Sequence, residues 1–184
     1  AGTPINENNL VDAVDYDGVS INLTFDADGE APFHFSYDDV GKIQFVGEID
    51  LAATDEDPAF TLSGSSQSFV VKPYDMSVYR VENAIGDSNP GTSGSGVGFV
   101  IAEEPFEVGV KVLNAHGRET PNYGNETTAE GVQVSLTSIE FPGGATEGAL
   151  ANRQAFSDEG AGVFVNDTLE WSEVGTIKIQ ASVA

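Results

Sequence analysis

Apolar residues recur at every second position along most of the chain. Such alternation lines one face of a half-buried β-strand, because successive side chains of a strand point to opposite faces. It is clearest at 106–112 and 177–183, and no segment shows convincing i, i+3, i+4 spacing of an amphipathic helix. The other alternating segments are 19–25, 33–37, 43–51, 60–62, 69–71, 76–78, 132–136, 163–165 and 169–171. The pattern predicts an all-β protein.

Turn-forming residues separate these segments. Asp28-Gly29 lies between the first two and indicates a hairpin turn. An acidic break at 55–58 follows the third segment, and Lys72-Pro73 ends the fifth. We therefore place a domain boundary here, with one domain over 1–72 and the next over 73–184.

A short internal repeat relates the two halves. Residues 37–43 (YDDVGKI) parallel 171–177 (WSEVGTI) at an offset of 134 residues (171 − 37). In each copy an aromatic residue ends a strand, acidic residues and Val-Gly form a corner, and an alternating strand follows. This layout fits the crossover of a Greek-key sandwich, so we predict two tandem immunoglobulin-like β-sandwich domains.

The two domains differ in size. About seven strands are typical of an immunoglobulin-like sandwich, and the 72 residues of the first domain are few for that number. We expect the first domain to lack its first strands. Its predicted core is Ile21, Leu23, Phe35, Ile43 and Phe45. The predicted core of the second domain is Val110, Val134, Trp171, Ile177 and Ile179.

The charge is strongly acidic, with 7 Lys+Arg against 30 Asp+Glu and a net charge of −23. Nucleic acids and anionic membrane surfaces are therefore excluded as partners, since both require basic patches. No apolar run approaches the roughly 20 residues of a membrane helix, so we expect no membrane insertion. The many carboxylates favour an extracellular or cell-surface protein, because negative charge aids solubility in salt water.

Little in the sequence points to catalysis. The chain has no Cys and only two His, which rules out thiolate chemistry and the usual Cys/His zinc sites. His34 falls on the polar parity of its segment, and His116-Gly117 is typical of a turn. The Gly-rich stretch 94–98 precedes a strand-like segment instead of a helix. We therefore expect a protein that is not an enzyme.

Calcium is the one cofactor that the sequence suggests. Hard oxygen ligands concentrated on loops are its requirement, and none of the acidic loops completes a twelve-residue EF-hand. The candidate ligands are Asp26, Asp28, Asp55 and Asp57. The alternative for the first pair is a plain Asp-Gly hairpin turn, which needs no ion, and we favour it.

Several motifs resemble a known family of bacterial surface proteins. They are 71–77 (VKPYDMS), 105–108 (PFEV), 114–117 (NAHG), 120–126 (TPNYGNE) and 171–175 (WSEVG). Through them the chain is similar to the C-terminal β-rich region of the mannose-sensitive haemagglutinin pilus biogenesis protein Q (MshQ-like) family over most of 60–184. The resemblance implies an exported, non-catalytic structural or adhesive module, encoded with type IV pilus machinery, whose partners are other surface or pilus proteins.

Two further possibilities concern what the chain binds. A carbohydrate-binding module is the alternative function, and its aromatic platform would come from Tyr16, Tyr74, Tyr79 and Tyr123. The shortage of strands in the first domain also predicts homotypic association by strand edges, since an extended segment can complete an open sheet. The segment 1–14 is the expected donor strand.

Overall fold

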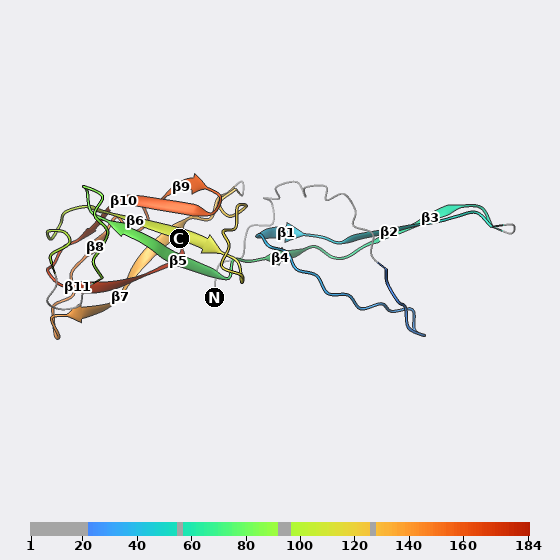
Figure 1. Cartoon of the computed structure of the whole chain (residues 1–184), viewed down its shortest axis with the longest axis horizontal. Coiled ribbons are helices and arrows are strands. Elements are labelled where there is room, and N and C mark those ends of the chain that lie inside the picture. Colours follow the sequence, from blue (N-terminus) through green and yellow to red (C-terminus); the bar gives the residue numbers. More distant parts are fainter. Residues whose placement is uncertain (1–21, 55–56, 92–96, 126–127) are drawn as a thin grey trace.

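A computed structural model of the chain describes residues 22–54, 57–91, 97–125 and 128–184. Every regular element in these residues is a β-strand, which confirms the all-β prediction. Figure 1 shows an elongated molecule, in which the later strands form a sandwich and the first four form a ribbon that extends from one end of it. None of the described residues forms a helix suited to crossing a bilayer.

Two antiparallel sheets make up the sandwich. The first runs in the order β5 (Asp75–Glu82), β6 (Phe106–Leu113), β10 (Val163–Trp171), and the short strands β8 (Leu150–Ala151) and β9 (Ser157–Gly160) also pair with β10. The second contains β7 (Val132–Phe141) and β11 (Thr176–Val183). Because β6 and β10 are neighbours in space but not in sequence, the chain crosses between the sheets as a Greek key requires.

The core lies between these two sheets and confirms the predicted second core. Alternate residues of β6 are fully buried, Val110 among them, and Val134 and Trp171 meet them from β7 and β10. Ile177 and Ile179 of β11 pack against the same cluster. Alternation along these strands therefore places one apolar face of each sheet inside.

A bulge in β10 changes which positions face the core. The pairing of β10 with β6 shifts register between Asn166 and Leu169, so buried positions pass from even to odd numbers. Asn166 is fully buried here, and its Nδ2 donates to the carbonyl of Asn152 at 2.7 Å. Its Oδ1 accepts from the N–H and the hydroxyl of Thr168. The buried amide is thus satisfied on both sides, as burial of a polar group demands.

The ribbon is a long hairpin in two sections. β1 (Gly41–Ile43) pairs with β4 (Phe69–Val71), and β2 (Val46–Leu51) pairs with β3 (Phe60–Ser65). Opposite pairs on one face of β2 and β3 are apolar, namely Ile49 with Leu62 and Leu51 with Phe60. The other face carries Glu48, Asp50, Thr61 and Ser63. The ribbon is therefore amphipathic, as its alternation requires.

The predicted first core is wrong for the described residues. Leu23 and Phe35 are exposed, Ile43 and Phe45 are only half-buried, and Ile21 lies outside the described residues. Phe35 stacks edge-on against Phe45 at a centroid distance of 4.3 Å, and Phe33 and Phe69 join this cluster. These rings cover only the base of the apolar face. Beyond it, the described residues place no second layer over the ribbon, so its side chains stay exposed.

Residues 22–37 contain the predicted turn but not the predicted strands. Gly29 has φ +80°, and the N–H of Asp26 donates to the carbonyl of Glu30 at 2.9 Å, which confirms the Asp-Gly turn. The strands expected at 22–25 and 33–37 are wrong, because no ladder of backbone hydrogen bonds continues beyond the turn. Residues 19–21 lie outside the described residues.

The core position of Trp171 yields the first prediction. Trp171→Ala should lower the free energy of unfolding by about 3–5 kcal/mol, since it removes a large buried side chain and leaves a cavity. Trp171→Phe should cost less, because a ring still fills the site. Urea unfolding followed by circular dichroism measures both variants. An unfolding midpoint for Trp171→Ala equal to that of the wild type would contradict this assignment of the core.

Candidate functional site

The segment that leads into β1 turns a corner against the end of the sandwich. Val40, at this corner, is only 1% exposed and belongs to the buried cluster of the sandwich. Gly41 follows with φ +140°, a conformation open to glycine, and begins the ribbon. A residue of the first domain thus lies in the core of the second.

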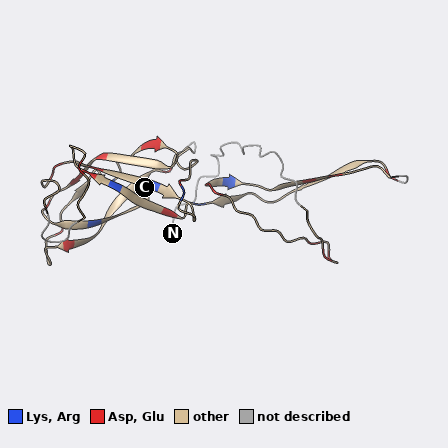
Figure 2. Cartoon of the chain, viewed as in Figure 1, with Lys and Arg blue, Asp and Glu red and all other residues tan. Residues whose placement is uncertain are grey.

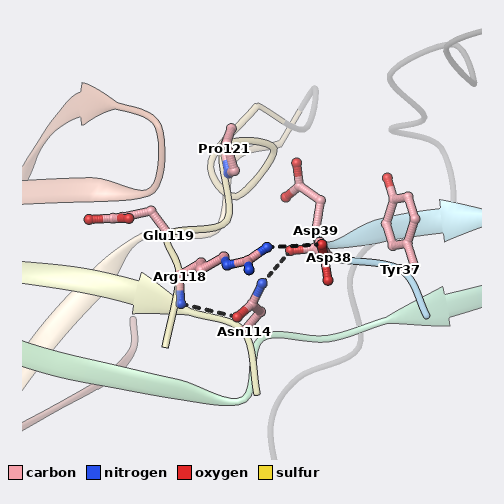
Figure 3. Close-up of a pocket in the computed structure, with 7 residues that line it drawn as sticks. All are labelled: Tyr37, Asp38, Asp39, Asn114, Arg118, Glu119 and Pro121. Atoms are coloured by element: carbon pink, nitrogen blue, oxygen red, sulfur yellow. Dashed lines mark hydrogen bonds and ion pairs between the residues drawn. The ribbon is translucent and has the colours of Figure 1, made fainter. Parts of the chain in front are cut away.

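Polar contacts hold the two residues that precede Val40, and Figure 3 shows those of Asp38 with Asn114 and Arg118. The Nδ2 of Asn114 donates to the main-chain carbonyl of Asp38 at 2.7 Å, and the N–H of Asn122 donates to Oδ1 of Asp39 at 3.1 Å. Arg118 points at Oδ2 of Asp38 at 3.4 Å. We call Asp38, Asp39 and Val40 the corner, and Asn114, Arg118 and Asn122 the socket.

The loop that carries the socket is itself held firmly. The Oδ1 of Asn114 accepts from the N–H groups of His116 and Arg118 and so fixes the turn between them. Thr120 is fully buried, and its hydroxyl donates to the carbonyl of Val112. Tyr123 packs edge-on against the ring of Phe164 and donates to the carbonyl of Gly131. The socket is therefore anchored on the core.

A shallow open pocket of about 260 Å³ lies between corner and socket. Glu119 borders it, and its carboxylate accepts from Nζ of Lys111 at 2.6 Å. This hydrogen bond holds the pKa of Glu119 below its usual value and raises the pKa of Lys111. The other two carboxylates bind Arg118 and backbone N–H groups. Asp38 and Asp39 therefore serve the contact between the domains, whereas Glu119 pairs within the second domain.

The chain returns to the junction after β4 and crosses there into the sandwich. That strand ends at Val71, β5 begins at Asp75, and the N–H of Tyr74 donates to the carbonyl of Leu113 at 2.8 Å. The predicted boundary at 72/73 falls in this crossing and stays a prediction. Corner and crossing together form a two-point junction between ribbon and sandwich.

The candidate calcium ligands do not come together. Oδ1 of Asp26 accepts from the N–H groups of Asp28 and Glu30, each at 2.9 Å, so the turn itself uses this carboxylate. The N–H of Asp57 donates to the hydroxyl of Thr54, away from Asp26 in the sequence. Asp55 lies outside the described residues. Within the described residues, no group of three or more acidic or histidine side chains could hold a metal ion.

The remaining candidates occupy different settings. His34 and His116 are both exposed, and His116 lies in the predicted turn. The prediction that Tyr123 is a sugar-binding residue is wrong, because its side chain is 1% exposed and belongs to the core. Tyr74 is exposed, the ring of Tyr79 lies against Gly109, and Tyr16 is outside the described residues. The carbohydrate-binding alternative thus keeps Tyr74 and Tyr79 as its exposed candidates among the described residues.

Sequence reasoning missed the junction although it identified both of its parts. The corner is the first copy of the internal repeat, and Asn122 and Tyr123 belong to the 120–126 motif. One signal could have indicated the contact. Val40 is apolar, although it lies between acidic residues and glycine where strand alternation has stopped, and such a residue needs a partner beyond its own strand.

The second prediction concerns Val40. Val40→Ala should lower the free energy of unfolding by about 1.5–3 kcal/mol, because two buried methyl groups are lost and a cavity remains. The control Val174→Ala, at the repeat-equivalent position that is 80% exposed, should change it by less than about 0.5 kcal/mol. Urea unfolding gives both values, and small-angle scattering tests whether the ribbon bends away. Equal effects of the two substitutions would contradict the role of Val40.

Comparison with known proteins agrees with this architecture. The family model described as "Domain of unknown function (DUF6701), first Ig-like domain" matches residues 2–65, and the one described as "DUF6701, second domain" matches residues 72–167. The search of curated proteins found no match, and neither did the search of solved structures. The matches confirm two tandem immunoglobulin-like parts and indicate a structural module. The chain belongs to the DUF6701 family.

Proposed function

We propose that this chain is a non-catalytic structural or adhesive module of a bacterial cell-surface or type IV pilus-associated protein. The observation that carries the proposal is the junction. There Val40 is buried in the core of the second domain, and Asp39 accepts a hydrogen bond from the N–H of Asn122 in that domain. A junction that fixes two domains in line suits a module that holds other parts of a protein at a distance.

The composition and the sequence motifs support the same proposal. A net charge of −23 keeps an exposed protein soluble at high ionic strength. The motifs at 71–77 and 120–126 resemble the MshQ-like surface proteins. Membership of the DUF6701 family supports a structural role. The resemblance to the MshQ-like proteins supports a location at the pilus or the cell surface.

The setting can be tested on intact cells that produce the protein. Antibody against the chain should label unpermeabilised cells, and brief external protease should remove the label, because an exported module is exposed. The protein should also be found in the fraction released when pili are sheared off, with a cytosolic enzyme as the negative control. Label that appears only after permeabilisation would contradict the proposal.

The ribbon supports homotypic association as part of this function. Ile49 and Leu62 are a cross-strand pair on the apolar face of β2 and β3, and they are 56% and 55% exposed. An uncovered strand pair of this kind also offers unpaired backbone groups at its edges. Ala1 to Val14, the expected donor, lies outside the described residues. We propose that copies of the chain associate through this ribbon.

Sedimentation across a salt series tests the association. The mass should rise with ionic strength, because salt screens the repulsion between copies that each carry −23 charges. Leu62→Lys, on the apolar face, should abolish the effect, whereas Ser63→Lys adds the same charge to the polar face and should preserve it. A wild-type chain that stays monomeric at every salt concentration would contradict homotypic association.

A further inference from the structure

The corner between the two domains has a counterpart in the second domain. Residues 38–41 correspond to residues 172–175 in the internal repeat. The backbone agrees with this equivalence, since Gly41 has φ +140° and Gly175 has φ +152°. Each glycine leads into a strand, β1 in the first case and β11 in the second. The two segments are therefore the same structural corner.

Their surroundings differ sharply. Val40 is 1% exposed, whereas Val174 is 80% exposed. The second corner follows Trp171, at the far end of β10, while Val163 at the other end of β10 pairs with Lys111 beside the socket loop. The turn between β10 and β11, which carries Val174, thus lies at the end of the sandwich remote from the ribbon (Figure 1).

Other apolar side chains are exposed at this remote end. They lie in the loops that follow β5 and precede β6, at the end of β7, and between β10 and β11. The residues are Ile85, Ile101, Phe141 and Val174. Phe141 is near the corner, because its carbonyl lies against Gly175. We call these four residues the distal end.

Basic residues are not prominent among these loops (Figure 2), and the corner itself is acidic through Glu173. In the observed junction, Asp39 accepts an N–H from Asn122, and Asp38 pairs with Arg118. Glu173 is the counterpart of Asp39 and carries the same acceptor group. The distal end therefore offers the chemistry of the first corner: one apolar anchor next to a carboxylate.

We propose that the distal end binds a further immunoglobulin-like domain of the same kind, which follows head to tail as the second domain follows the first. Val174 enters the socket of that domain, and Glu173 accepts a backbone N–H there. A second copy of this chain does not fit, because its own Val40 already fills its socket. The inference goes beyond the proposed function, since it holds wherever the protein resides.

The experiment uses the absence of Cys from the chain, which makes a single introduced thiol a clean probe. Because residue 184 corresponds to residue 50 in the repeat, a fusion of residues 1–184 to a second copy of 51–184 continues the pattern by one domain. Val174→Cys, placed in the first copy, is labelled with a thiol reagent in the 184-residue chain and in the fusion. Val46→Cys, in the ribbon and 73% exposed, is the control.

The expected result is protection that depends on the added domain. The thiol of Val174→Cys should react as fast as that of Val46→Cys in the 184-residue chain, and at least about tenfold more slowly in the fusion, where reaction requires local opening. Unchanged reactivity in a fusion whose added domain is folded overturns the proposal. Protection in the 184-residue chain that grows with protein concentration also overturns it, since a second copy would then be the occupant.

A second variant keeps the proposal testable if the added domain of the fusion does not fold. Asp38→Ser with Asp39→Glu gives the first corner the sequence of the second. In this background, the thiol of Val40→Cys should stay as protected as in the otherwise unchanged chain, because a corner of that sequence is able to dock. If it reacts as fast as the thiol of Val174→Cys, the second corner cannot form the junction and the proposal is wrong.

Discussion

The molecule depends on the burial of one apolar face of each sheet. A β-sheet with alternating side chains is stable in water only when its apolar face is covered. The β7–β11 sheet covers the sheet of β5, β6 and β10, and the side chains of Val108, Val110 and Val112 are fully buried between them. The ribbon has no such cover over most of its length in the described residues, so its position depends on its contact with the sandwich.

Magnitudes decide which part of that contact matters most. Full burial of a valine contributes about 1.5–3 kcal/mol, and a hydrogen bond between a carboxylate and an N–H about as much. The pair of Arg118 and Asp38 is largely exposed, with side chains 70% and 57% accessible, so it contributes little. Val40 and Asp39 therefore hold the junction, while Arg118 favours one orientation.

Periodicity predicted the strands of the sandwich and the faces that they bury, because those strands have a partner sheet. The same reasoning failed for Phe35, whose alternation implies a covered face that the described residues do not provide. It failed in the opposite sense for Tyr123, which lies in a turn-rich motif that predicts exposure yet is buried against Phe164. The repeat identified the corner, but no periodic signal shows that Val40 packs into another domain. Local patterns specify which side of a strand is apolar, and they do not specify what lies opposite.

The two-point junction has a mechanical consequence. A pull along the long axis is carried by the covalent crossing at Lys72-Pro73, which cannot separate. A sideways load instead acts on the noncovalent corner, where Val40 would have to leave the core and Asp39 its hydrogen bond. Such contacts break and re-form without damage to the backbone. We therefore expect the pair of domains to resist small lateral forces, to bend under large ones, and to straighten again when the force is removed.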